Sequence, residues 1–450
     1  MLASRARPPL VLLAALVASG AGRAADPVPE PVVVPAVLHL EDAVRLVRER
    51  GLDLLVAEAS VRGAEGDLRA AQAVANPALS LSYGRSFTYG HCVDAQGAPA
   101  ACELPPDPLY GVGLSDQGAI ADALSGKRGL RVGVARAALE AARASREDAR
   151  RSVEALMRQG FIAMLVAQEA ERFAGDVATA SARTLQLTQA RYEAGAISEA
   201  DVARVEVAKL EADQARTSAA QALRAARINL AFLLGVRGPV PEFAVDEPDL
   251  LRASAPPAVQ HATRDALLER ARAHRPDLAA QRRQAERAEA TLSLARRRRF
   301  PDVQLSLDYA QQGTTANAIS PPTLTVGISL PLPLLYQQQG EIRRADADLA
   351  AQRVGVARVE AQVAADVASA WSDFAAAAEL AQRMEGGLLE RAARARDLVE
   401  VQYRKGAASL LDYLDAQRTF TGTRVEYLND LASYWTAFFR LEQAVGEELR

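Results

Sequence analysis

The amino-acid sequence predicts a mainly α-helical protein with a small β part and an internal two-fold repeat. Three observations predict this fold class. Long alanine-rich segments carry apolar residues at helical spacing. Four shorter segments alternate apolar and polar residues, as β-strands do. Both kinds of segment occur in the same order in each half of the chain, which is typical of a duplicated structural unit.

The composition favours wide helix–helix contacts over a thick globular core. Of the 450 residues, 49% are apolar and 24% are charged, which excludes a disordered chain, but only 5% are aromatic. Alanine, a small helix former, supplies roughly a fifth of the chain. The 53 basic and 56 acidic residues leave a net charge of −3, which argues against a nucleic-acid partner held by bulk charge.

The N-terminus has the features of a secretory signal peptide. Arg5 and Arg7 precede the apolar run Leu10–Ala18, and small residues follow it. We therefore expect residues 1–25 to be a signal peptide, with cleavage between Ala21 and Ala25. Since no later stretch has 18 consecutive apolar residues, we expect no transmembrane helix in the exported protein.

Cys92 and Cys102 are the two cysteines of the sequence, and they lie in a turn-rich segment. In an oxidising compartment, the natural interpretation is one disulfide bond between them. A metal site is the weaker alternative, because His91 is adjacent but a fourth ligand is missing.

The repeat defines the domain organisation. Tyr192-Glu-Ala-Gly195 reappears as Tyr403-Arg-Lys-Gly406, 211 residues later. We therefore expect a first repeat over residues 38–235 and a second over 261–446. Residues 236–260, rich in proline and acidic residues, form the predicted connector.

Each repeat is predicted to contain helices and one pair of strands. In the first repeat we expect helices over 41–73, 127–193 and 199–234, and strands over 78–87 and 109–117. In the second repeat we expect helices over 262–298, 341–404 and 409–445, and strands over 302–312 and 323–331.

The helix lengths predict how the helices pack. At 1.5 Å per residue the helix over 127–193 is about 100 Å long, and the shorter helices of its repeat are about 50 and 54 Å. Two short helices laid end to end therefore match the long one. Apolar residues at 3.5-residue spacing from Val367 to Val399, interrupted at Glu385, predict antiparallel coiled-coil packing along this rod. Trp435, Phe438 and Phe439 are expected to serve helix packing.

The predicted strands have the length and the two-faced character of transmembrane β-strands. Four strands cannot close a barrel, and lipid does not tolerate an open sheet edge. Copies of the chain are therefore expected to pool their strands, so that two chains supply eight strands and three chains supply twelve. The alternative is a small soluble sheet that caps a helical rod.

The sequence resembles the TolC-like outer-membrane factor family over residues 38–446. The features that carry the resemblance are the signal peptide, the duplication, Asn76-Pro77 before a strand, and the stretch from Tyr403 to Gln417. The resemblance implies a homotrimer with a twelve-stranded outer-membrane barrel above a long periplasmic α-helical tunnel. It also implies an exit duct that works with a periplasmic adaptor and an inner-membrane pump, of the resistance-nodulation-division type, in contact with outer-membrane lipid.

Within the family, Ser125-Gly126-Lys127-Arg128 resembles the junction of the cation-efflux (CzcC/CusC-like) branch. Drug or solvent efflux and type I secretion remain alternative cargoes, and a soluble periplasmic coiled-coil adaptor is the alternative of a different class. The four histidines, His39, His91, His261 and His274, are scattered and form no visible metal cluster.

The resemblance places the working residues at the periplasmic end of the tunnel. Asp412 and Asp415 match the family's aperture aspartates, and six such carboxylates in a trimer would attract cations. Tyr403 and Asp201 match a pair whose hydrogen bond locks the aperture. Asp201 and Asp412 also fit capping boxes, which is the structural alternative. Ala408 is a departure, because the best-known member of the family has an arginine of the lock at this position, so the closed state is expected to be held differently.

Four consecutive arginines, Arg296, Arg297, Arg298 and Arg299, precede a predicted strand. They are expected to anchor the barrel rim to lipid headgroups, or else to complement a helix C-terminus. Enzyme motifs are not recognisable: Gly126-Lys127 lacks the rest of a phosphate loop, and neither a nucleophile elbow nor H-E-x-x-H occurs. We therefore expect no catalytic residue, cofactor or bound metal.

Overall fold

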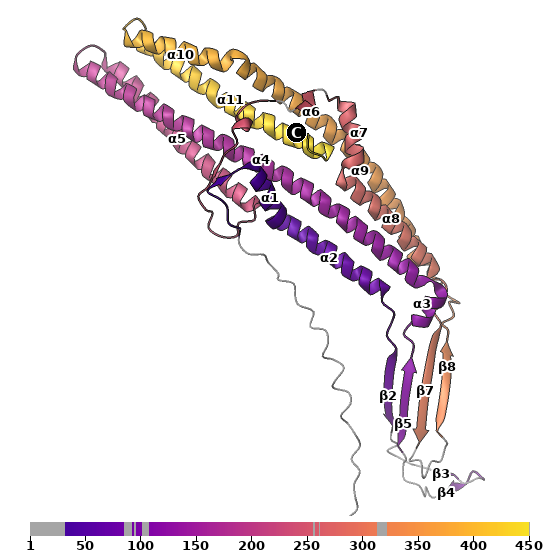
Figure 1. The fold of residues 1–450 in the computed structure, drawn as a ribbon. Coiled ribbons are helices and arrows are strands. Elements are labelled where there is room, and N and C mark those ends of the chain that lie inside the picture. Colours follow the sequence, from indigo (N-terminus) through magenta and orange to yellow (C-terminus); the bar gives the residue numbers. More distant parts are fainter. Residues whose placement is uncertain are drawn as a thin grey trace, which may run out of the picture.

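The computed structural model describes residues 32–84, 92–93, 96–100, 108–254, 257–260, 262–312 and 322–449. They form a long, gently curved helical bundle with a four-stranded sheet at one end (Figure 1). The predicted signal peptide lies outside these residues, and so does Cys102 of the predicted disulfide. Among the described helices, none is both long and apolar enough to cross a membrane.

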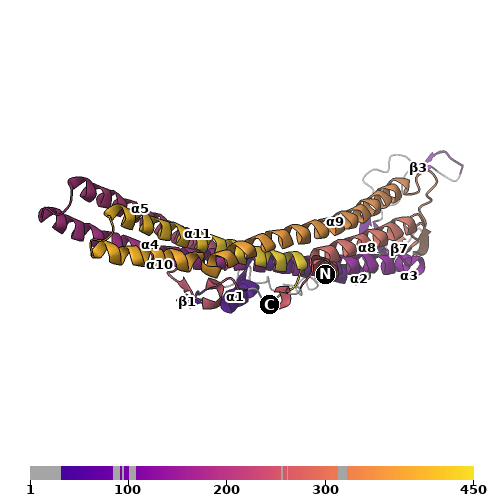
Figure 2. The same ribbon diagram turned by 90° about the horizontal axis from the view of Figure 1, so that it is seen from above.

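The first half of the chain is organised around one unbroken helix. Its helices are α1 (Leu40–Arg50), α2 (Leu52–Gln72), α3 (Ala119–Ser125), α4 (Lys127–Glu193) and α5 (Glu199–Leu233). α4 has 67 residues, and α2 and α5 both pack along it, as the helix lengths predicted (Figures 1 and 2). The single helix predicted over 41–73 is wrong, because the chain turns at Gly51. A Cβ there would lie 2.5 Å from the Val47 carbonyl oxygen, so this turn requires glycine.

The second half repeats this order with more interruptions. Its helices are α7 (Arg264–His274), α8 (Pro276–Arg297), α9 (Gln339–Arg383), α10 (Leu389–Arg404) and α11 (Leu410–Val445). The helix predicted over 262–298 is two helices, because Arg275 is extended before Pro276. The helix predicted over 341–404 breaks at a π-helical turn, Met384–Leu388, where Gly387 has a φ of 138°.

The sheet has the strand order β2-β5-β7-β8 and is antiparallel throughout. Its strands are β2 (Ala78–Gly84), β5 (Leu109–Ser115), β7 (Gln304–Gln312) and β8 (Thr323–Ser329). In this register Leu81 lies opposite Val112, Val112 opposite Tyr309, and Tyr309 opposite Leu324, so apolar side chains share one face. These side chains are exposed, and β2 and β8 form the two open edges.

The sequence did not predict several short elements, most of which connect the halves. β1 (Val37–Leu38) pairs in parallel with β6 (Ala244–Val245), which fastens the connector to the start of the chain. A 3₁₀ turn, Pro248–Leu251, and α6 (Pro257–Gln260) follow in the connector. β3 (Cys92–Val93) and β4 (Pro99–Ala100) form a small hairpin beyond the sheet.

The main core lies at mid-length, where α4, α9 and α11 come together under α1 and α7. Phe161, Tyr434, Phe438 and Phe439 are buried there, with exposed fractions of 0 or 1%. The prediction that Trp435, Phe438 and Phe439 serve helix packing is confirmed.

Candidate functional site

The candidate site is the end of the bundle farthest from the sheet, where the hairpins α4/α5 and α10/α11 turn (Figure 1). Both turns follow the repeated Tyr-x-x-Gly sequence. Gly195 and Gly406 have φ values of 73° and 79°, a left-handed conformation that glycine adopts without strain. The repeat therefore builds two similar tips side by side, and Figure 2 shows the same neighbourhood from above.

Each tip begins its second helix with a capping box. Ser198 caps α5 together with Asp201, and Ser409 caps α11 together with Asp412. The Asp412 carboxylate accepts hydrogen bonds from the backbone N–H and the hydroxyl of Ser409, at 3.0 and 2.7 Å. These bonds, that of the hydroxyl first, lower the pKa of Asp412 below its usual range. The capping role predicted for both aspartates is therefore confirmed, and Asp412 is anionic at neutral pH.

The two tips differ in charge one turn further on. In the first tip Arg204 pairs with Asp201 at 3.2 Å. The repeat places Asp415 at the position of Arg204, and Asp415 is exposed and has no ion pair among the described residues. Among the described residues neither Asp412 nor Asp415 has an ion pair, whereas Asp201 of the other tip is paired with Arg204.

Tyr403 joins the two tips through its ring. It stacks on Tyr413, with ring centroids 5.3 Å apart, and the Arg191 guanidinium lies 5.0 Å above it. Asp201 is bonded to Ser198 and Arg204, and no hydrogen bond between Asp201 and Tyr403 occurs in the described part of this single chain. The proposed lock pair is thus not joined here.

Sequence reasoning missed Arg191 and Tyr413, which hold the tips together. The Tyr413 ring is buried, and its hydroxyl lies 3.5 Å from the Thr184 hydroxyl on α4. The sequence could have identified Arg191 and Tyr413 only if the two hairpins had already been known to lie side by side.

A groove of about 740 Å³ runs along the tips between α4, α5 and α11. Its lining includes the exposed apolar residues Val207 and Leu411, and Asp415 lies within it. The Arg418–Glu211 ion pair, at 3.2 Å, bridges α11 and α5 beside the groove. This surface combines apolar contact area with a free carboxylate.

At the opposite end, the Ser125–Arg128 junction fastens the helices to the sheet. The buried Lys127 ammonium donates to Asp302 Oδ1 and to the Phe300 carbonyl oxygen, both at 2.6 Å. Arg297 donates from Nε to the Ser125 carbonyl oxygen at 2.7 Å and lies over the Phe300 ring. One of the four predicted anchor arginines therefore has a structural partner.

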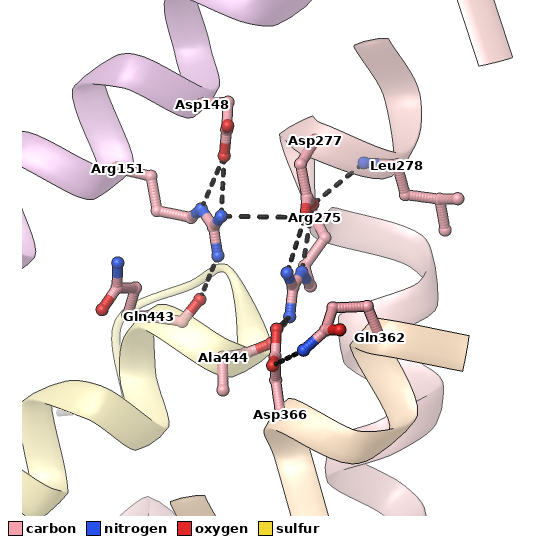
Figure 3. Close-up of polar contacts among 9 residues, drawn as sticks. All are labelled: Asp148, Arg151, Arg275, Asp277, Leu278, Gln362, Asp366, Gln443 and Ala444. Atoms are coloured by element: carbon pink, nitrogen blue, oxygen red, sulfur yellow. Dashed lines mark hydrogen bonds and ion pairs between the residues drawn. The ribbon is translucent and has the colours of Figure 1, made fainter. Parts of the chain in front are cut away.

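A charged network fixes the middle of the bundle, and Figure 3 shows its residues. Arg275 donates to both carboxylate oxygens of Asp277 and, at 2.8 Å, to Asp366. Burial is the largest single influence on Asp277 and opposes its charge, but the hydrogen bonds and charge of Arg275, the charge of Arg151 and the Leu278 N–H together outweigh it and lower the pKa of Asp277. Arg151 lies 3.9 Å from the same carboxylate, and it also donates to the Gln443 carbonyl oxygen.

A second polar contact holds the helix break at Gly387. Glu385 Oε1 accepts from the Ala253 N–H at 2.8 Å, and the Tyr427 hydroxyl lies 2.8 Å from the same oxygen. Burial first, and then the hydrogen bond to Glu385, raises the pKa of Tyr427. The connector between the repeats is thereby bonded to the break.

Comparison with known proteins now decides the family. The sequence profile of the outer membrane efflux protein family matches residues 43–236 and 267–447, most of the chain. This chain belongs to the outer membrane efflux protein family. It is similar to the "Cobalt-zinc-cadmium resistance protein CzcC" of Cupriavidus metallidurans, with 26% identity over 416 residues, 91% of this chain and 90% of that protein.

Solved structures share its fold. A membrane protein from Pseudomonas aeruginosa matches with a TM-score of 0.74 and 17% identity, over 93% of this chain and 91% of that one. The CusC structure matches with a TM-score of 0.71 and 17% identity, over 91% of this chain and 92% of that one. VceC from Vibrio cholerae matches with a TM-score of 0.69 and 18% identity, over 91% of this chain and 97% of that one.

The family orients the molecule. This outer membrane efflux protein is an exit duct whose sheet belongs to the outer membrane and whose helices form a tunnel in the periplasm. The apolar face of the sheet is accordingly the face that suits lipid. Asp412 and Asp415, in the first turns of α11, belong to the end of the bundle farthest from the sheet.

Proposed function

We propose that three copies of this outer membrane efflux protein form the exit duct of a tripartite system that exports metal cations. The duct receives its cargo from an inner-membrane pump of the resistance-nodulation-division type through a periplasmic adaptor. The observation that carries this proposal is the similarity to CzcC, which extends over 91% of this chain and 90% of that protein. The resemblance of Ser125–Arg128 to the cation-efflux branch supports it.

The sheet supports assembly of the chain into trimers. A four-stranded sheet with open edges at β2 and β8 leaves backbone groups unpaired, which lipid does not tolerate. Three copies supply twelve strands, and a closed barrel of that size has room for a lumen.

The tips supply the selective element. Three copies bring six carboxylates, from Asp412 and Asp415, to the periplasmic end of the tunnel, where they attract cations. Tyr403 and Asp201 form the closing contact between hairpins when the trimer shuts. With Ala408 where the family's best-known member has an arginine, this contact relies on fewer hydrogen-bond donors. The groove between α5 and α11 offers the adaptor an apolar surface.

The rim of the barrel carries the headgroup anchor. Arg296, Arg298 and Arg299 are exposed at the end of α8, next to β7, and face the inner leaflet in this proposal. Arg297, which is bonded to Ser125, contributes through the protein instead.

The proposed ring of six carboxylates is tested by single-channel conductance. In the Asp412→Asn/Asp415→Asn variant, the amide oxygen at position 412 can still accept from Ser409, so the cap remains while both charges are lost. We expect half-maximal block by periplasmic Zn²⁺ to need about tenfold more metal than in the wild type. The matched control, Asp346→Asn/Asp348→Asn on α9, removes two exposed carboxylates far from the tip. Equal block in all three proteins would refute the ring.

The cargo is tested by deletion of the gene from its own bacterium. We expect the deletion strain to become sensitive to cobalt, zinc and cadmium salts, with unchanged tolerance of organic drugs and solvents. The reverse pattern would identify a drug or solvent duct. If the protein washes off the outer membrane in high salt, it is a soluble adaptor instead.

A further inference from the structure

The segment Leu330–Tyr336, between β8 and α9, is apolar and exposed. Leu332, Leu334 and Leu335 have exposed fractions of 65, 78 and 98%. The segment is nevertheless held in a defined conformation: the Leu334 N–H donates to the Leu332 carbonyl oxygen at 2.9 Å. At its end, the Tyr336 hydroxyl bonds Glu341 Oε2 at 2.5 Å. Such a preformed apolar surface loses little conformational freedom when it binds a partner.

A mostly apolar hollow lies where the helices meet the sheet, beside the residues that lead into the other edge strand, β2. Its volume is about 520 Å³, and its lining includes Val74, Ala119, Ala123, Gly129 and Val132. Val74 precedes β2, and the other four belong to α3 and the start of α4. The exposed segment follows the edge strand β8, and Val74 of the hollow lies in the link before the other edge strand, β2. β8 ends and β2 begins at the helix-proximal end of the sheet (Figure 1).

We propose that Leu330–Tyr336 of one copy docks against this hollow of the next copy, where β8 pairs with β2. This inference rests on the homotrimer proposed above. β8 ends and β2 begins at the same end of the sheet, so their pairing is antiparallel like every other pair in it. The segment that follows β8 then runs beside the start of β2, and its last residues meet those that precede β2.

The repeat supplies an internal precedent for this contact. Within one chain β5, the second strand of the first half, pairs with β7, the first strand of the second half. The contact between β8 and the next copy's β2 has the same relation. Just beyond β5 the chain is still hydrogen-bonded to the neighbouring strand β7, because the Asp116 N–H donates to the Leu305 carbonyl oxygen at 2.9 Å. Leu330 occupies the position of Asp116 in the repeat, and its N–H is expected to donate to a carbonyl oxygen of the next copy's β2 in the same way.

The precedent also fixes the register. Ser115 lies opposite Ser306 in the β5–β7 pair. The offsets of 214 residues for the second strand and 224 for the first convert this pair into Ser329 opposite Ser82. In this register Ile328 lies opposite Tyr83, and both belong to the apolar face. A slip of one residue would oppose apolar and polar faces and is therefore disfavoured.

Disulfide trapping in the full-length protein in outer membranes tests the proposal. Oxidation should convert Ser329→Cys/Ser82→Cys and Leu334→Cys/Val74→Cys into covalent trimers on a denaturing gel, which disappear on reduction. The matched controls are Ser329→Cys/Leu81→Cys, which tests the register slipped by one residue, and Leu334→Cys/Val354→Cys, which pairs the segment with an exposed site on α9.

The outcomes separate this inference from the trimer itself. If native mass spectrometry finds a trimer but neither pair is trapped, the docking is refuted and the proposed assembly stands. If the protein is monomeric, both are refuted. If Ser329→Cys/Ser82→Cys is trapped but Leu334→Cys reacts with a lipid-phase thiol reagent instead of with Val74→Cys, the segment contacts lipid and its docking is refuted.

Discussion

Arg275 offers the sharpest test of what holds the bundle together at mid-length. Its side chain is 4% exposed and donates to Asp277, to Asp366 and to the Ala444 carbonyl oxygen. Arg275→Met keeps most of the volume but removes the charge, so two carboxylates lose their main partner. Removing one member of a buried ion pair costs about 3–5 kcal/mol. Arg151 remains near Asp277, and Gln362 remains bonded to Asp366, so we expect the lower end, about 3 kcal/mol.

Urea unfolding followed by far-UV circular dichroism measures this loss. All variants are compared at one protein concentration, because subunit association adds to apparent stability. The matched control is Arg283→Met, which breaks an exposed pair with Glu286 and should cost less than about 1 kcal/mol. Adding Asp366→Asn to Arg275→Met should recover about 1 kcal/mol by removing one unpaired carboxylate. Equal losses for Arg275→Met and Arg283→Met would refute the reasoning.

Three further predictions concern local contacts. The pKa of Asp277 is lower in the folded than in the unfolded chain, so its charge stabilises the fold above about pH 4, and this stabilisation is lost as the pH falls further. In urea unfolding, the difference in unfolding free energy between wild type and Asp277→Asn should therefore shrink from about pH 6 to about pH 3. Tyr427→Phe should lose about 1 kcal/mol with its bond to Glu385, against no loss for the exposed Tyr192→Phe. Ser409→Ala should weaken the start of α11 by about 1 kcal/mol, measured by faster amide exchange in its first turn.

The long elements could be predicted because their signals are local. The helix expected over 127–193 is α4, Lys127–Glu193, because Gly126 and Gly195 mark its ends. The strands appear where alternation placed them. The capping boxes at Ser198 and Ser409 were also predictable, because their partners lie three residues apart.

The interruptions and the long-range contacts could not be predicted in this way. Gly51 and Gly387 lie inside periodic patterns, and a glycine within a helical pattern does not say whether the helix will break. The two-residue strands β1 and β6 are too short to have a period. Arg275 and Asp366 are 91 residues apart, so their ion pair exists only once α9 lies beside the α7–α8 joint.

The break at Gly387 gives the two halves of a duplicated chain different mechanical properties. α4 is continuous and has buried residues from Lys127 to Thr188, whereas α10 buries none of its own residues in the single chain and is attached through a glycine joint. Bending stress in the assembled tube should therefore concentrate at one joint per subunit. In the trimer proposed above, continuous and jointed helices alternate around the tunnel. Its periplasmic end can therefore widen with threefold symmetry while the continuous helices keep their positions.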